Sequence, residues 1–183
     1  MTSPRPDAAA GRSDRADRIR AWRAGRRLAL AAVFEADFGQ RTATAVLERH
    51  LADSESDPDA AELARRIVDA VVRFRDRIDA DIDRIAPQYP VVQLARIDRA
   101  LLRCATGEVL HSGTTPARVA IAEWVELART YSGDPARRLM NGVLGRIAEE
   151  HATDSAHRGP RDQNPASGRE PPTPDPQEGV SGR

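Results

Sequence analysis

The sequence is poor in the residues that cross-link a fold or anchor it in a membrane. A single cysteine excludes any disulfide within the chain, and with it the class of disulfide-stabilised scaffolds. Aromatic residues make up only 4% of the chain, and lysine is absent, so all 28 basic residues are arginine. No apolar run approaches the roughly 18 residues of a membrane helix, and the N-terminus lacks the apolar core of a signal peptide. We therefore expect a cytoplasmic protein.

Patterns for catalysis and metal binding are also missing. The four histidines are scattered, and none has a cysteine or carboxylate neighbour at the spacing of metal ligands. They are His50, His111, His151 and His157. The sequence has neither a glycine-rich phosphate loop nor a nucleophile elbow. We expect no cofactor, no metal and no enzymatic activity.

The residues that are present favour helices. A core with few aromatics must be built from Ala, Leu, Val and Ile, which suits a helical bundle better than a sheet. Three acceptor–proline pairs mark helix starts, because the side chain caps the helix and proline fits its first position. These pairs are Asp57-Pro58, Thr115-Pro116 and Asp134-Pro135. An all-α fold of about six helices is predicted, near residues 14–37, 42–53, 58–86, 92–111, 116–132 and 135–149.

Apolar residues recur at helical spacing through these segments. From Leu63 to Ile85 they follow one another at steps of three and four residues, which predicts one long amphipathic stripe that includes Phe74. Cys104 falls in a similar pattern and is expected to be an inert core thiol. Trp124 belongs to another such row, which favours a core position over an exposed anchor for a partner. Gly133 is expected to end a helix.

The two ends of the chain have a different composition. The last 33 residues contain six prolines and four glycines, and almost nothing that could be buried. Ordering such a segment costs entropy that no burial offsets, so we expect residues 151–183 to form a disordered tail. Residues 1–13 are similarly expected to be a disordered arm. One helical domain over residues 14–150 remains.

The stretch MNGVLGRI, residues 140–147, allows two interpretations. Asn-Gly between apolar runs is a strong hairpin signal, but the helix start at Asp134-Pro135 and the apolar spacing place it inside the last helix. Glycine within a helix is costly, so we expect Gly142 to mark the close approach of another helix. Asn141 is expected to be an interior hydrogen-bonding residue.

The net charge of zero conceals a strongly basic segment. Residues 11–27 contain seven arginines against two aspartates, whereas residues 53–62 carry five acidic residues and no base. A basic segment on a neutral protein indicates a local contact with a polyanion. The alternative is a solvated helix whose arginines form ion pairs one turn apart, such as Asp14 with Arg18.

Four stretches together resemble the NusB family. They are RRLALAAVFEAD (26–37), ARIDRALLR (95–103), PARVAIAEWVELAR (116–129) and MNGVLGRI (140–147), in the family's order and spacing. The resemblance implies a NusB-like fold of two small packed helical bundles, and a transcription antitermination factor without enzymatic activity. It implies binding to the boxA element of the ribosomal RNA leader together with NusE, within the antitermination complex of RNA polymerase. It also allows a homodimer, in which the RNA surface would be covered.

The same resemblance implies which residues bind RNA. Arginines of the first helix would contact phosphates, and an aromatic near the end of that helix would stack on a base. Asp98 would accept hydrogen bonds from base amino groups, although it could instead pair with Arg99 or Arg103. The implied RNA-binding residues are Arg20, Arg23, Arg26, Arg27, Phe34, Asp98 and Leu139.

Departures from the family pattern motivate a second hypothesis. Leu139 stands where the family commonly has phenylalanine, and leucine cannot stack on a base as an aromatic ring does. Ala122 and Trp124 also replace residues of the family's INEA motif. The chain could thus be a protein-interaction bundle of the same family with weakened or lost RNA recognition. A third hypothesis is a ribosomal RNA cytosine methyltransferase, some of which begin with a NusB-like domain. It is disfavoured because the expected tail leaves no space for a cofactor-binding domain.

Overall fold

The computed structural model describes residues 6–113 and 115–157. Its α-helices are α1 (Pro6–Ala36), α2 (Ala43–Ala52), α3 (Pro58–Ile85), α4 (Arg96–Gly107), α5 (Ala117–Tyr131) and α6 (Asp134–His157). A 3₁₀ turn, η1 (Val91–Gln93), precedes α4, and a π-helical segment, η2 (Glu108–Ser112), follows it. These described residues contain no strand. The prediction of an all-α fold is therefore confirmed.

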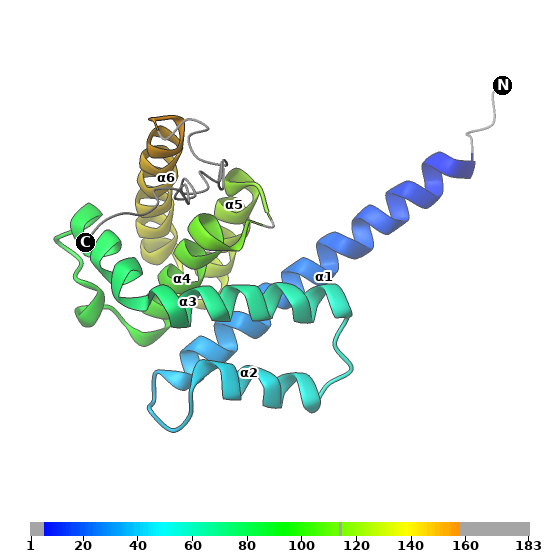
Figure 1. The fold of residues 1–183 in the computed structure, drawn as a ribbon, viewed down its shortest axis with the longest axis horizontal. Helices are drawn as coiled ribbons and strands as arrows, with labels where there is room; N and C mark the ends of the chain where they lie inside the picture. Colours follow the sequence, from blue (N-terminus) through cyan, green and yellow to red (C-terminus); the bar gives the residue numbers. More distant parts are fainter. Residues whose placement is uncertain (1–5, 114, 158–183) are drawn as a thin grey trace, which may run out of the picture.

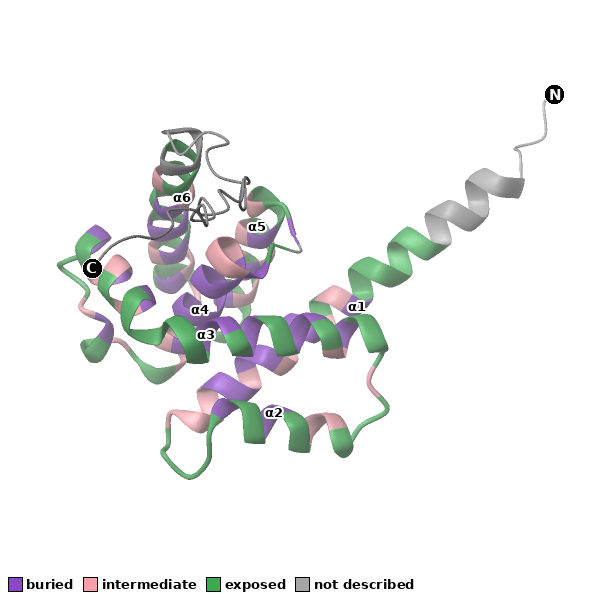
Figure 2. Cartoon of the chain, in the orientation of Figure 1, coloured by how far each residue is buried: buried purple, intermediate pink, exposed green. Residues whose placement is uncertain are grey.

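The helices form two packed groups, as expected (Figure 1). In the first group α1 packs against α2 and α3, and in the second α5 packs against α6. α4 lies between the groups and contacts α1, α3, α5 and α6. The outer part of α1 extends beyond this body, and its residues 14–20 are all exposed (Figure 2). The basic segment of the sequence is thus partly free of the core.

The core is built from the expected apolar stripes. Along α3 the stripe from Leu63 to Ile85 is buried except at Phe74, which is 36% exposed. Phe74 has φ −116° and ψ 18°, which kinks the helix and turns this position out of the stripe. Cys104 and Trp124 are fully buried, which confirms that both are core residues. Burial raises the pKa of the Cys104 thiol well above its ordinary value.

Two of the predicted helix boundaries are confirmed, and others differ. Asp57 caps α3 by accepting a hydrogen bond of 2.8 Å from the backbone N–H of Asp59. Gly133 has a φ of 101° directly after α5 and so ends that helix. Pro116 is the N-cap residue of α5, with no side-chain cap, and α6 already includes Asp134. The helix expected over residues 92–111 is divided into η1, α4 and η2.

Both outer helices are longer than expected. α1 begins at Pro6 and α6 continues to His157, so residues 6–13 and 151–157 are helical where we expect disorder. Neither stretch contains a proline after the first helical position, and both contain alanine. A packed helix can extend into such residues, because adding a residue to an existing helix is far easier than nucleating one. The expectations for residues 1–5 and 158–183 lie outside the described residues.

The stretch MNGVLGRI is helical, and the hairpin is excluded. Met140 and Leu144 are buried, but Asn141 and Gly142 are exposed. A Cβ added at Gly142 would meet nothing within 4 Å, so the expectations of a close approach there and of an interior amide are both wrong. Both positions lie outside the buried face of α6.

The close approach of two helices occurs elsewhere in the structure. A Cβ at Gly25 of α1 would lie 2.6 Å from the backbone oxygen of Ala60 in α3, a distance that no real side chain tolerates. Gly25 therefore allows the two longest helices of the first group to touch.

No helix in the described part of the chain has a stretch long and apolar enough to cross a membrane.

Candidate nucleic-acid interface

Four of the predicted RNA-binding residues form one stripe along α1. Arg20, Arg23, Arg27 and Phe34 follow one another at intervals of three, four and seven residues, which places them on one face of the helix. We call this set the α1 stripe. At about 1.5 Å per residue, it spans about 21 Å. Its three arginines are exposed to solvent.

The arginines of the α1 stripe have different partners. Arg20 pairs with Asp17 one turn away on the same helix. The guanidinium of Arg23 donates to both carboxylate oxygens of Glu123 on α5, at 2.9 Å each. This hydrogen bond lowers the pKa of the Glu123 carboxyl below its ordinary value. Arg27 takes part in none of the ion pairs among the described residues.

The alternative interpretation is that the arginines of the basic segment form ion pairs one turn apart. In the part of the segment whose side chains are described, only one such pair is present. That pair joins Asp17 to Arg20, whereas Asp14 and Arg18 form no pair there. Most of the positive charge on this face is therefore not neutralised within α1.

An aromatic pair ends the α1 stripe. The ring of Phe34 meets the ring of Phe38 edge to face, with 5.4 Å between their centroids. Phe38 lies just beyond the end of α1 and is 50% exposed, and the guanidinium of Arg96 lies 4.3 Å from its ring centroid. Phe38 is not among the residues predicted from the sequence, although its position four residues after Phe34 was the available signal. Ring faces and a cation thus stand at one end of the row of arginines.

Arg26 is in the interior, not on the surface where the resemblance places it. Its side chain is 1% exposed and donates two hydrogen bonds, of 2.9 and 2.7 Å, to the Glu108 carboxylate in η2. The same carboxylate accepts a hydrogen bond of 2.7 Å from Trp124 Nε1, and Arg26 also donates to Thr115 Oγ1 at 3.3 Å. Arg26 therefore joins α1 to the second group of helices and cannot reach a phosphate.

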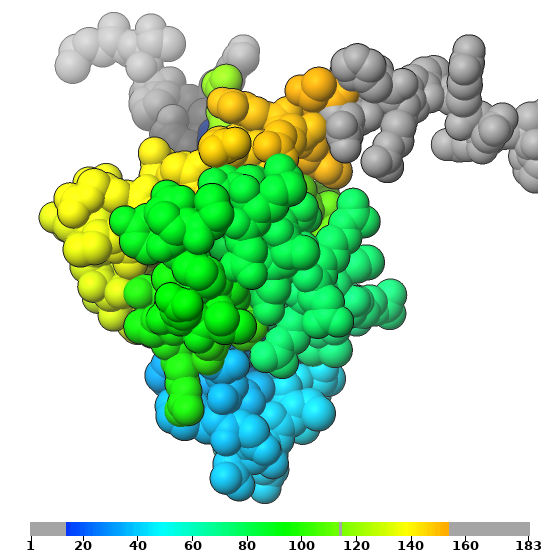
Figure 3. Space-filling model, turned by 90° about the vertical axis from the view of Figure 1, so that its left-hand side faces the viewer, coloured from blue at the N-terminus to red at the C-terminus, as the bar shows by residue number. Residues whose placement is uncertain are grey.

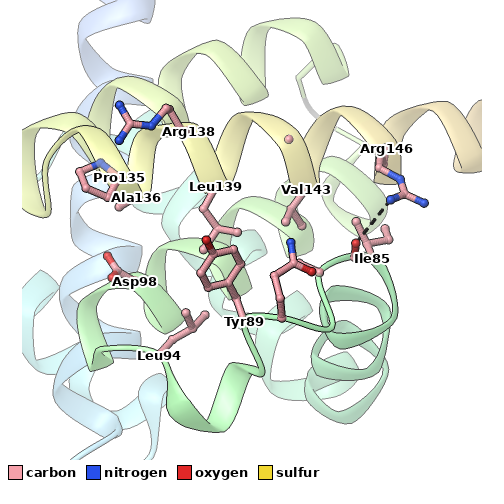
Figure 4. A pocket seen from close by; sticks show the side chains of 13 residues that line it. Ile85, Tyr89, Leu94, Asp98, Pro135, Ala136, Arg138, Leu139, Val143 and Arg146 are labelled. Carbon is pink, nitrogen blue, oxygen red and sulfur yellow. Dashed lines mark hydrogen bonds between the residues drawn. The ribbon is translucent and has the colours of Figure 1, made fainter.

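The last two predicted residues, Asp98 and Leu139, lie together at a different place. They line a hollow of about 540 Å³ between α6 and the segment that connects α3 to α4. We call it the α4–α6 hollow. Figure 3 shows this face, where the connecting segment (green) meets the first half of α6 (yellow) above the lobe of α1 and α2. In Figure 4, Leu139 points from α6 toward the ring of Tyr89, and Asp98 lies beyond Leu94.

Asp98 carries an unsatisfied oxygen in this hollow. Its Oδ1 is buried and has no hydrogen-bond partner. The two arginines that could have paired with it bond elsewhere, Arg99 to Asp37, and Arg103 to Asp37 and to Asp79 at 2.7 Å. Leaving a carboxylate oxygen buried and unpaired is costly, and the Asp98 carboxylate therefore stands beside the hollow as a charge that no ion pair neutralises among the described residues.

The described residues hold no group of three or more histidine, cysteine or carboxylate side chains placed to share a metal ion. The polar clusters of the two sites consist of guanidiniums and carboxylates. Such groups recognise other molecules by charge and by hydrogen bonds.

Comparison with known sequences identifies the family. A sequence profile of the NusB family matches residues 23–149. The transcription antitermination protein NusB of Dehalococcoides mccartyi is 36% identical over 136 residues, which are 74% of this chain and 95% of that protein. The corresponding protein of Symbiobacterium thermophilum is 40% identical over 133 residues, covering 68% of this chain and 87% of that protein.

Solved structures agree in fold. A structure of T. maritima NusB matches with a TM-score of 0.66 and 31% identity, covering 74% of this chain and 96% of that one. A crystal structure of antitermination factors NusB and NusE in complex with dsRNA matches with a TM-score of 0.64 and 22% identity. It covers 72% of this chain and 98% of that chain. The profile spans most of the chain, and the relatives are transcription antitermination factors, not enzymes. This chain therefore belongs to the NusB family of transcription antitermination factors.

Proposed function

We propose that the protein binds the boxA element of nascent ribosomal RNA through the α1 stripe, together with NusE. Within the RNA polymerase antitermination complex, this binding promotes processive transcription of ribosomal RNA in the cytoplasm. The observation that carries the proposal is the α1 stripe itself, three exposed arginines in a row that ends in an aromatic pair. The crystallised relative that is bound to NusE and dsRNA supports the choice of partners.

The chemistry of the α1 stripe fits a single RNA strand. Each guanidinium offers a planar fork of donors that matches a phosphate, and the arginines are spaced along about 10 Å of helix between Arg20 and Arg27. Phosphate contacts release counterions, so affinity should fall steeply as salt rises. Phe34 and Phe38 provide ring faces at one end, on which an unpaired base can stack.

The α4–α6 hollow forms the contact with NusE in this proposal. An RNA strand brings phosphates close to any base that it presents, and phosphates repel the Asp98 carboxylate. A guanidinium or ammonium of a protein partner bound in the hollow supplies the missing positive charge. The walls of the hollow also suit a protein surface, because Leu94, Leu139 and the half-exposed ring of Tyr89 lie there beside polar and charged side chains, among them Arg138 and Arg146.

The position of Leu139 bears on the hypothesis of lost RNA recognition. Leu139 lies in the α4–α6 hollow and not on the α1 stripe, so its missing ring leaves the aromatic pair at the end of α1 intact. The RNA-binding function is therefore favoured over a bundle that binds proteins alone.

The RNA contact is tested by Arg27→Gln. This variant should weaken binding to a boxA RNA about threefold to tenfold at low salt, and reduce the slope of log affinity against log salt by about 0.7. Arg77→Gln is the matched control, since Arg77 is also exposed and enters no ion pair among the described residues. Equal losses in both variants would show that the α1 stripe is not the RNA contact.

The NusE contact is tested by Asp98→Asn. This variant should weaken NusE binding at least tenfold, because the partner's cation loses the charge that it neutralises. Asp76→Asn, an exposed aspartate of α3, should leave NusE binding unchanged. If Asp98→Asn weakened RNA binding and left NusE binding intact, Asp98 would contact the RNA instead.

A further inference from the structure

A second hollow lies on α1 next to the α1 stripe and has no role in the proposed function. It has a volume of about 610 Å³ and runs between the outer part of α1 and the first turns of α5. We call it the α1–α5 groove. Ile19 and Trp22 line it from α1, and Val119 lines it from α5 beside Pro116.

The floor of the groove is apolar and uncovered. Ile19 is 40% exposed and Val119 is 46% exposed, so two large aliphatic side chains meet solvent there. Trp22 is partly buried against the core and also lines this hollow. Exposed apolar side chains gathered in a concave site mark a place where another molecule binds.

The rim of the groove is mainly basic. Arg15 and Arg18 are exposed, and neither takes part in an ion pair within the described part of the chain. Arg23 stands at the inner end, held by Glu123, and Asp14 lies at the outer end. The two unpaired guanidiniums flank the apolar floor and are free to bind an anion.

This combination selects the class of ligand. An apolar segment of a protein would cover the floor, but it would also take the two unpaired guanidiniums out of water without neutralising them. An unpaired nucleotide matches both parts of the groove. Its base stacks on an indole or covers aliphatic carbon, while its phosphate meets a guanidinium.

We propose that the α1–α5 groove holds unpaired nucleotides of the RNA that flank the boxA element. This inference rests on the proposed function. The groove and the α1 stripe lie on adjoining faces of α1 and share Arg23, so one RNA strand can pass from the stripe into the groove. The groove thereby extends the RNA contact toward the exposed outer part of α1.

The test compares two RNAs on the full chain. One is a boxA RNA alone, and the other is the same RNA extended by about six unpaired uridines, a length within the range of single-strand binding sites. The extension is tested first at the 5′ end and then at the 3′ end. For the unmodified protein, the extension at one of the two ends should raise affinity about tenfold. In Val119→Asp the ratio of the affinity for the extended RNA to that for boxA RNA alone should fall to about one. The new carboxylate repels the phosphate and interrupts the apolar surface of the groove.

Val72→Asp is the matched control. Val72 is 51% exposed on α3, outside the groove, so this variant should keep the full gain from the extension. Both valines are exposed, and neither change disturbs the core. The proposal is overturned if neither extension raises affinity for the unmodified protein, or if Val119→Asp keeps the gain.

Failure of the proposed function can be told apart from failure of the groove. If the boxA RNA alone does not bind, the proposed function fails, and a uridine oligonucleotide by itself then tests the groove. The chain has two tryptophans, and Trp124 is fully buried, so quenching of fluorescence reports on Trp22. Quenching that Val119→Asp removes supports the groove, and the absence of quenching overturns it.

Discussion

At the scale of single residues, Arg26 and Arg27 show that neighbouring arginines can serve opposite purposes. Arg26 is buried and holds Glu108, whereas Arg27 is exposed and enters no ion pair among the described residues. Removing one partner of a buried pair leaves the other charge uncompensated. Arg26→Ala should therefore lower the free energy of unfolding by about 3–5 kcal/mol, measured by urea denaturation.

The control for this prediction is the adjacent residue. Arg27→Ala should change the free energy of unfolding by no more than about 0.5 kcal/mol. If Arg26→Ala left the stability unchanged and lowered the affinity for RNA, Arg26 would be an RNA-binding residue, and its structural role would be contradicted.

The burial of a residue can be predicted from the sequence only where the residue belongs to a row of apolar residues at helical spacing. Cys104 and Trp124 stand in apolar rows at helical spacing, so their burial is predictable. Arg26 stands among six other arginines, and its partner Glu108 is 82 positions away. Nothing local distinguishes it from Arg23 or Arg27. The Arg26–Glu108 pair joins segments that are far apart in the sequence, so only the structure shows it.

At the scale of helices, replacing either of two glycines by alanine should change the free energy of unfolding in opposite directions. Gly142 is exposed within α6, so Gly142→Ala should raise the free energy of unfolding by about 0.5–1 kcal/mol through better helix propensity. Gly25→Ala should lower it, because the added Cβ would collide with the backbone of Ala60. Urea denaturation of both variants measures the effect. A loss at Gly142→Ala or no loss at Gly25→Ala would contradict this assignment.

The boundaries of helices were predictable at Asp57-Pro58 and Gly133, and not at Thr115-Pro116 or Asp134-Pro135. Asp57 and Gly133 act as expected, since each supplies a local hydrogen bond or backbone angle. The kink at Phe74 and the π-helical segment η2 were not predicted. There Phe74 stacks on His111, with 4.0 Å between ring centroids, and this contact joins α3 to η2 across 37 positions. Such distortions arise from tertiary packing, so periodicity along one helix does not reveal them.

At the scale of the whole molecule, the sequence predicts the α1 stripe better than the hollows. The α1 stripe lies on one helix, and both its charge and its spacing can be read along the chain. The α4–α6 hollow joins residues near 85–98 to residues near 135–146, and the α1–α5 groove joins residues 14–26 to 116–123. The resemblance supplied Asp98 and Leu139 individually. Their shared position, and the unpaired oxygen of Asp98, depend on how the two groups of helices pack.

The most direct test of the proposed function is a titration of the full chain onto a boxA RNA and a scrambled RNA of equal length, with and without NusE. We predict tighter binding to boxA than to the scrambled RNA, a further gain with NusE on boxA, and a steep loss of affinity as salt rises. Equal affinity for the two RNAs under all these conditions would contradict sequence-specific recognition.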